Sequence, residues 1–240
     1  MPSDIAALWV YLSANPLLHL TLTLSAYVLA NRVYRRFGRT PLLNPVLIAV
    51  LVLVGLLKLT GTPYTDYFEG AQFVHFLLGP ATVALAVPLY RQIQAVKRNL
   101  PALLAAIAVG SVTASASAVL LGRLFGAGPQ TLLALAPKSV TTPVAMGIVE
   151  RLGGLPSLAA VLVILTGIIG AMLGPLVLNL LRIRDRSARG VAMGTASHGI
   201  GTARAMQISE VGGAFAGLAM GINALATALL LPLLWGWLAG

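Results

Sequence analysis

The sequence has no cysteine and very little acidic charge. It contains only 6 Asp and Glu among 240 residues, and charged residues make up 9% of the chain. A chain without Cys forms no disulfide, no thiolate metal site and no cysteine nucleophile. Soluble domains carry about 25% charged residues, so this chain has too few to cover a solvated surface. The composition therefore excludes an ordinary water-soluble domain.

The chain is instead strongly apolar and basic, with 58% hydrophobic residues and a formal net charge of +10. The apolar excess extends over the whole chain, which predicts one integral membrane domain over residues 1–240. In a soluble protein this charge would suggest nucleic acid. In a membrane protein Lys and Arg gather in short cytoplasmic loops, so we expect no nucleic acid partner.

Apolar runs follow one another along the chain, and about 20 apolar residues cross the hydrocarbon core of a bilayer. We expect helices in the apolar runs 17–30, 45–57, 71–90, 100–121, 158–181 and 214–238. Two further runs, 131–151 and 191–208, are interrupted by polar residues, Gly or Pro. The run 71–90 is interrupted as well, at Gly79-Pro80 and at Pro88.

Basic residues orient these segments. Eleven of the sixteen Lys and Arg residues lie in three short segments, 32–39, 91–98 and 182–189. When all three are placed in the cytoplasm, the N-terminus lies outside the inner or plasma membrane. The segment Met1–Leu12 has no basic run and does not match a signal peptide.

The same orientation makes residues 131–155 begin and end outside. This predicts either a re-entrant hairpin or two short half-helices. Pro137 and Pro143 are suitable break points, because proline interrupts the hydrogen-bond ladder of a helix.

The predicted crossings form two triplets of opposite direction, each with an interrupted middle member. We therefore expect inverted repeats over about 17–124 and 131–238. Opposed triplets with broken centres are typical of inverted-repeat secondary transporters. The predicted fold is an all-α polytopic membrane protein, a transporter-like bundle with discontinuous helices that are broken or re-entrant.

Lys138 and Arg204 lie inside interrupted apolar segments. A basic side chain at the bilayer centre costs about 2.5–3.5 kcal/mol on insertion scales, which indicates a functional role. Broken helices also present free N–H groups and a positive dipole end, which suit a carboxylate. The alternative is that both side chains reach an interface, or pair with Glu150 or Glu210.

The candidate binding set adds hydroxyl groups, glycines and one amide to these two cations. Hydroxyl and amide groups bind a carboxylate without further charge. The predicted substrate-binding residues are Lys138, Ser139, Thr141, Thr142, Thr195, Ser197, His198, Gly199, Thr202, Arg204, Gly79 and Asn44.

His198 titrates near neutral pH if it is unperturbed, so it is a candidate for coupling a proton to transport. The alternative is a buried histidine bonded to a backbone carbonyl. Glu150 and Glu210 are further candidates, although both would also suit solvated helix ends. No metal-ligand spacing or nucleophile motif is present, so we expect no metal, no cofactor and no enzyme.

Four motifs give the chain a family resemblance. They are Pro41-Leu-Leu-Asn-Pro45, Phe76-Leu-Leu-Gly-Pro-Ala-Thr-Val-Ala-Leu-Ala86, Pro137-Lys-Ser-Val-Thr-Thr-Pro-Val-Ala145 and Gly194-Thr-Ala-Ser-His-Gly-Ile-Gly-Thr-Ala-Arg-Ala205. With them the chain resembles the LrgB/CidB family from about Leu17 to its C-terminus. Residues 1–16 fall outside the resemblance and suggest a variable leader.

The resemblance implies a polytopic membrane protein with one of two roles. Bacterial members are described as holin/antiholin-like modulators of murein hydrolase export, and often work with a small membrane partner of the LrgA/CidA type. Plastid relatives look like glycolate/glycerate transporters, and some bacterial relatives are tied to pyruvate uptake. The buried cations and broken helices favour a carrier of small organic monocarboxylates, with the pore or regulator as the alternative. A homodimer is the commonest closed assembly.

Overall fold

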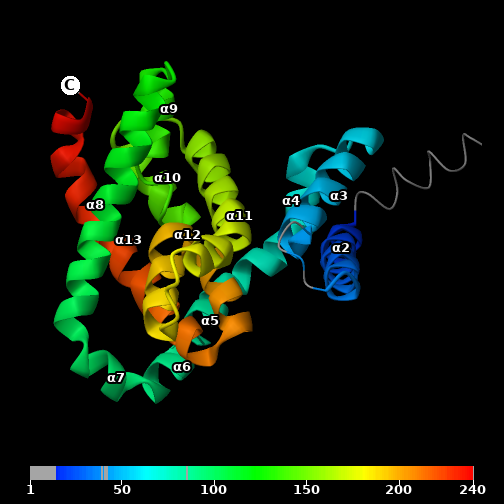
Figure 1. Cartoon of the computed structure of the whole chain (residues 1–240). Helices are drawn as coiled ribbons and strands as arrows, with labels where there is room; N and C mark the ends of the chain where they lie inside the picture. The colour runs from blue at the N-terminus through cyan, green and yellow to red at the C-terminus, as the bar shows by residue number, and fades with distance from the viewer. Residues whose placement is uncertain (1–14, 39, 41–42, 85, 240) are drawn as a thin grey trace, which may run out of the picture. The chain divides into compact units, whose positions relative to one another are not determined.

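The computed structural model describes residues 15–38, 40, 43–84 and 86–239, and every regular element among them is a helix (Figure 1). The predicted all-α fold is confirmed for these residues. The chain falls into two compact units, Met1–Ala84 and Leu85–Gly240. The outside N-terminus and most of the expected leader concern residues 1–14, which lie outside the described residues. The single membrane domain and the inverted repeats stay predictions.

In the first unit, the N-termini of α2 (Pro16–Arg36) and α3 (Pro45–Thr60) are capped by asparagine, Asn15 and Asn44. The unit also holds α4 (Tyr64–Phe76) and α5 (Leu78–Ala84). The side chain of Asn44 caps α3, because its Oδ1 accepts from the backbone N–H of Val46 at 2.8 Å and of Leu47 at 3.3 Å. Helix α2 packs on α3 through small residues, and Thr23 bonds Tyr67 of α4 at 2.9 Å between their hydroxyl oxygens.

The second unit holds the longer helices. They are α6 (Ala86–Arg91), α7 (Ile93–Arg98), α8 (Leu100–Leu124), α9 (Pro129–Leu135), α10 (Thr142–Arg151), α11 (Pro156–Leu180), α12 (Arg186–Ile208) and α13 (Glu210–Ala239). In Figure 1, α10 and α12 lie between α8 and α13 on one side and α11 on the other. Helices α10 and α12 thus occupy the middle of this unit.

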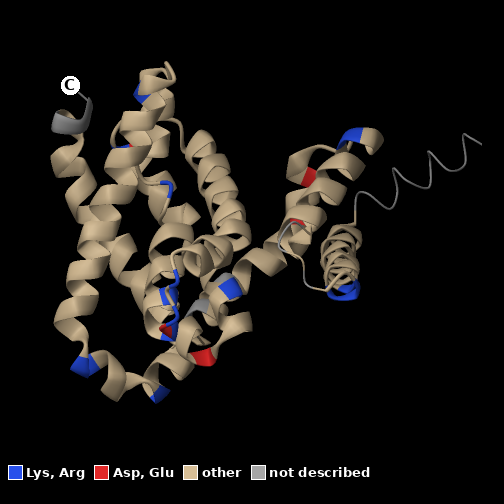
Figure 2. Cartoon of the chain, in the orientation of Figure 1, with Lys and Arg blue, Asp and Glu red and all other residues tan. Residues whose placement is uncertain are grey.

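Among the described residues, four stretches are long and apolar enough to cross a membrane, and the first of them also runs over Leu85, which lies outside those residues. They are Tyr64–Arg91, Leu100–Leu124, Pro156–Leu180 and Glu210–Gly236, and Pro45–Thr60 is apolar but shorter. Figure 2 shows long parts of α8, α11 and α13 without a charged residue. These stretches contain the predicted spans 71–90, 100–121 and most of 158–181 and 214–238. The prediction of a multi-pass membrane protein is confirmed at this level.

Helices α12 and α13 approach each other closely because glycine lines the contact. A β-carbon on Gly190 would overlap the carbonyl oxygen of Gly212, and one on Gly194 would overlap that of Ala216. Neither position has room for a side chain, so the two backbones pack directly against each other.

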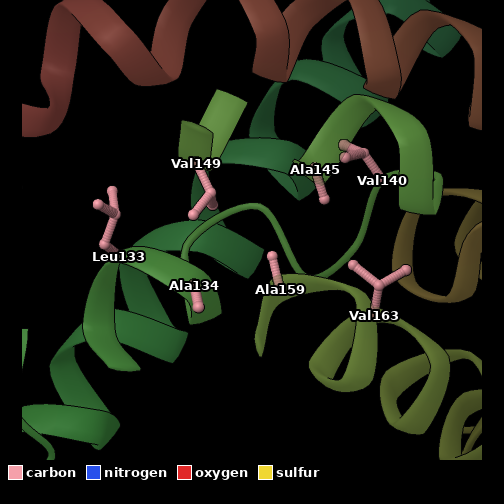
Figure 3. Packing of buried hydrophobic residues seen from close by; sticks show 7 residues of the cluster. All are labelled: Leu133, Ala134, Val140, Ala145, Val149, Ala159 and Val163. Carbon is pink, nitrogen blue, oxygen red and sulfur yellow. The ribbon is translucent and has the colours of Figure 1, made fainter. Parts of the chain in front are cut away.

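A buried cluster joins α9, α10 and α11 (Figure 3). Its members are Leu133, Ala134, Val140, Ala145, Val149, Ala159 and Val163, and five of them are 0% exposed. Residues buried to this degree pack at the density of a protein interior. The cluster holds the short helices α9 and α10 against the long helix α11, which fixes the segment between them.

The run 71–90 is divided among α4, α5 and α6. Helix α4 ends at Phe76 and α5 begins at Leu78, so Leu77 separates the two helices and Gly79 lies in the first turn of α5. Pro80 also lies in this first turn, where a missing N–H removes no helical hydrogen bond. The prolyl residue therefore stops the preceding helix and begins the next one.

Candidate functional site

Helix α12 is irregular at Ser197 and His198. Ser197 has φ −134° and ψ 18°, and His198 has φ 40° and ψ −134°. A positive φ at a residue with a β-carbon costs of order 1–3 kcal/mol, and such strain persists only where the surroundings impose it. The irregular point lies inside the predicted motif 194–205, at the residue that the sequence singled out as titratable.

Two hydrogen bonds hold His198 in place. Its Nε2 lies 2.9 Å from the carbonyl oxygen of Val163 on α11, and its own carbonyl accepts from the Thr202 hydroxyl at 2.8 Å. A carbonyl only accepts, so Nε2 carries a proton in this arrangement. The buried, carbonyl-bonded histidine was one of the two interpretations from sequence, and a role in proton coupling stays a prediction.

Glycines on α11 make room for the irregular point. A β-carbon on Gly167 would lie 2.6 Å from Nε2 of His198, and one on Gly170 would overlap the Ser197 hydroxyl. The positions of Ser197 and His198 therefore depend on the absence of side chains from the facing turn of α11.

A second irregular segment lies between α9 and α10. Helix α9 ends at Leu135 and α10 begins at Thr142. The intervening residues form turns, in which Lys138 N–H donates to Leu135 O and Val140 N–H to Pro137 O, both at 3.1 Å. Ser139 and Val140 are nonetheless buried. This non-helical backbone lies in the interior of the second unit.

Asn223 of α13 joins the two irregular segments. Its Nδ2 donates to the carbonyl oxygen of Ser139 and to that of Thr195, each at 3.2 Å. The side chain is only 1% exposed. One amide group therefore fixes the α9–α10 segment and the first half of α12 to the same point of α13.

Polar atoms without a partner remain beside this amide. Among the described residues, Asn223 Oδ1 and Thr195 Oγ1 are buried and accept or donate no hydrogen bond within the chain. An unpaired buried polar group costs about 1–3 kcal/mol, so each such group calls for a partner such as water or a ligand.

Lys138 directly precedes Ser139, whose carbonyl oxygen Asn223 holds. The side chain is half-buried, and its Nζ donates to Ser139 Oγ at 3.3 Å. No carboxylate pairs with Lys138 within the described ranges. Ser139 also carries the carbonyl that Asn223 holds, so the cation and the amide share one residue.

Arg204, the second predicted cation, lies one to two turns after the irregular point of α12. It is half-buried, and its Nη1 donates to Oε1 of Gln207 at 3.3 Å. Glu210, its suggested carboxylate partner, instead forms an ion pair with Arg91 at 3.0 Å, and both of those side chains are well exposed. Glu150 is exposed near the end of α10.

The remaining predicted residues lie in several places. Thr141 and Thr142 are half-buried at the start of α10, where Thr141 is the N-cap. Gly199 is half-buried directly after His198. Asn44 and Gly79 belong to the unit Met1–Ala84, where Asn44 caps α3 and Gly79 is exposed in α5.

The structure adds residues that the sequence did not single out. Asn223 is the most important, and Gly167 and Gly170 of α11 are the others. A signal for Asn223 was present, since Asn223 and Thr227 are the polar side chains of the apolar run 214–238. No group of His, Cys, Asp and Glu that could hold a metal ion occurs in the described part of the chain.

Comparison with known proteins covers nearly the whole chain. The LrgB-like family model matches residues 23–237. The chain is 40% identical over 215 residues to the uncharacterized protein YwbG of Bacillus subtilis, covering 90% of this chain and 95% of that protein. It is 32% identical over 218 residues to the holin-like protein CidB of Staphylococcus aureus, covering 91% and 95%. No solved structure matches. The chain belongs to the LrgB-like family of membrane proteins, as its four motifs predicted.

Proposed function

We propose that this protein is a secondary transporter of small organic monocarboxylates of the glycolate, glycerate or pyruvate kind. The single observation that carries the proposal is the bridge made by Asn223, which ties two irregular helical segments together in a buried polar site. Irregular backbone at membrane depth is tolerated only where it is buried in protein or lines a wet cavity. Such segments are where transporters bind their substrates.

The chemistry of this site supports an anionic ligand. Lys138 supplies a positive charge that no carboxylate neutralises among the described residues, and Thr195 supplies an unused hydroxyl. The start of α10 beside Thr141 and Thr142 supplies backbone N–H groups and a positive dipole end. Ser139, Ser197, Thr202 and Gly199 complete the site on the two irregular segments, and Arg204 supplies a second cation near it. Asn44 and Gly79 remain candidates from the first unit.

Transport in this proposal is coupled to a proton and follows alternating access. His198 is the preferred proton carrier because it forms the irregular point of α12, and Glu150 and Glu210 are the alternatives. One broken-helix unit would move against a scaffold of long helices, within inverted repeats over about 17–124 and 131–238. The working assembly is a homodimer in the inner or plasma membrane. The protein catalyses no chemical reaction and needs no cofactor.

The test is uptake by the full chain reconstituted in vesicles. Labelled glycolate, glycerate or pyruvate should enter with saturation, and an inward proton gradient should accelerate entry. Lys138→Gln and Arg204→Ala should each abolish saturable uptake, whereas Lys58→Gln, which removes a charge from the end of α3, should retain it. Normal flux in Lys138→Gln would remove this cation from the mechanism.

A holin/antiholin-like role is the second candidate, and the name of the Staphylococcus aureus relative, holin-like protein CidB, supports it equally well. In that case the protein would form or regulate a pore that controls murein hydrolase export and autolysis, together with a small partner of the LrgA/CidA type. Leakage of unrelated solutes from the same vesicles, without saturation by carboxylates, would favour this role over the carrier.

A further inference from the structure

A cavity of about 320 Å³ opens at one end of the second unit, and neither Lys138 nor Asn223 lines it. Its wall comes from the last turns of α11, the loop before α12, the first turns of α12 and the turn between α12 and α13. The membrane-crossing stretch Pro156–Leu180 ends just before this loop. The cavity therefore lies at the level where a span leaves the hydrocarbon core.

Three arginines line this cavity: Arg184, Arg186 and Arg189. The Nη1 of Arg189 donates to Asn179 Oδ1 at 2.8 Å and to the carbonyl oxygen of Ile183 at 2.9 Å, so its guanidinium is fixed. Arg184 and Arg186 are exposed, and neither side chain is engaged by another described residue.

The carboxylates nearest in sequence do not neutralise these arginines. Asp185 Oδ1 accepts from the Ala188 backbone N–H at 2.8 Å and from the Ser187 hydroxyl, so it caps α12. Glu210 is paired with Arg91. Neither carboxylate lines the cavity, so its wall carries an uncompensated positive charge.

Apolar side chains line part of the same cavity, among them Pro175, Leu178 and Met193, and Ser209 adds a hydroxyl group. A topology rule explains why Arg residues gather at the end of a span, but it does not explain a cavity between them. Guanidinium groups bind phosphate through two parallel hydrogen bonds, and basic pockets between membrane helices bind lipid headgroups. An apolar wall beside them suits an acyl chain.

We propose that this arginine cavity binds a phosphate-bearing anion, either the headgroup of an anionic phospholipid or a free phosphate. Arg184 and Arg186 hold the phosphate oxygens, and the anchored Arg189 sets the position of the charge. The site is separate from Lys138 and Asn223, so the proposal holds whether or not the protein carries carboxylates.

The test is thermal unfolding of the full chain, purified in detergent and stripped of lipid, against three probes. Dioctanoyl phosphatidylglycerol carries phosphate and acyl chains, dioctanoylglycerol has the same chains without phosphate, and inorganic phosphate has no chain. Ligand that binds only the folded protein raises its melting temperature. Phosphatidylglycerol should stabilise the protein at concentrations at which dioctanoylglycerol does not.

The double variant Arg184→Gln/Arg186→Gln should weaken this binding by about tenfold or more, because it removes charge-assisted hydrogen bonds. Arg35→Gln/Arg36→Gln, which removes two exposed arginines from the end of α2, is the matched control and should bind as the wild type does. Should the first variant fail to fold, Arg184→Lys/Arg186→Lys keeps the charge and removes the forked geometry, and it should still bind more weakly than the wild type.

The three probes also distinguish a lipid headgroup from a free phosphate as the ligand. Stabilisation by inorganic phosphate that the double variant loses identifies a free phosphate as sufficient, and stabilisation by phosphatidylglycerol alone identifies a lipid headgroup. Equal stabilisation by dioctanoylglycerol and phosphatidylglycerol would overturn the proposal. So would equal binding by the wild type and the glutamine variant, or an equal loss in the Arg35 and Arg36 control.

Discussion

The imidazole of His198 bonds the carbonyl oxygen of Val163 across 2.9 Å, which fastens the irregular point of α12 to α11. His198 also has a positive φ of 40°, so its side-chain bond helps to compensate a strained backbone. The same residue thus connects two helices and defines the bend in one of them.

Replacing His198 by Phe should lower the stability of the protein. Phe cannot donate to the Val163 carbonyl, and the loss of a typical hydrogen bond of this kind costs about 0.5–1.5 kcal/mol. His198→Gln keeps an N–H donor and should therefore lower the stability of the protein less than His198→Phe does. The melting temperature in detergent measures both effects, and His75→Phe, at an exposed position of α4, is the control. Identical melting of His198→Phe and wild type would contradict this account.

Gly167→Ala should disturb the same contact from the other side. The added methyl group would lie 2.6 Å from His198 Nε2, closer than two such atoms can approach. Overpacking of this kind costs about 1–3 kcal/mol. Gly221→Ala, where an added β-carbon meets nothing within 4 Å, should be tolerated. Equal melting of the two variants would show that the α11 glycine is not needed for the position of His198.

Asn223→Ala should destabilise the second unit and reduce carboxylate uptake together. The substitution removes the donor shared by the carbonyls of Ser139 and Thr195 and leaves both acceptors buried. We expect a loss of about 1–3 kcal/mol for each acceptor that finds no water. Asn99→Ala removes an amide that donates to one carbonyl, that of Ala95, at an exposed position, and it is the matched control. Full uptake by Asn223→Ala would separate the bridge from transport.

Lowering the pH should destabilise the N-terminal end of α12. Hydrogen bonds from the Ser187 hydroxyl and the Ala188 backbone N–H lower the pKa of Asp185 below its usual 3.8. A carboxyl whose pKa is lower in the folded state stabilises above the unfolded value, and this stabilisation is lost as pH falls through the folded value. The contribution is small because the side chain is exposed.

Melting temperatures measured from about pH 6 to about pH 2 test this prediction. Asp185→Asn keeps a capping oxygen but does not titrate, so its melting should depend less on pH below about 3.8 than that of the wild type. Asp66→Asn makes the same change of charge in the first turn of α4 and serves as the control. If the melting temperature of Asp185→Asn fell with pH as steeply as that of the wild type, the Asp185 carboxyl would not be the group that titrates.

The sequence predicted the helices well because an apolar run of membrane length has few alternatives to a helix. The spans at 100–121 and 158–181 lie within α8 and α11, and the interrupted motif 137–145 falls on the junction between α9 and α10. The break lies at Leu77 and not at Gly79, because the ring of Pro80 clashes with the carbonyl four residues earlier, that of Phe76, where α4 ends.

The contacts that organise the candidate site were beyond prediction. Nothing in the sequence says that Asn223 reaches Ser139 and Thr195, because those residues are distant in the chain and only packing brings them together. The same holds for Gly167, whose missing side chain matters only because His198 occupies the space. Motifs identified the irregular segments, whereas the partner of each segment depended on the tertiary structure.

The glycine contact between α12 and α13 limits how these two helices can move. Moving α12 lengthwise by one residue would bring Arg189 or Val191 into the place of Gly190, where backbone atoms of α13 leave no room for a side chain. Lengthwise sliding is therefore blocked, and the two helices are locked in register. A shape change in this unit would have to bend α12 at Ser197 and His198 rather than slide the helix as a rod.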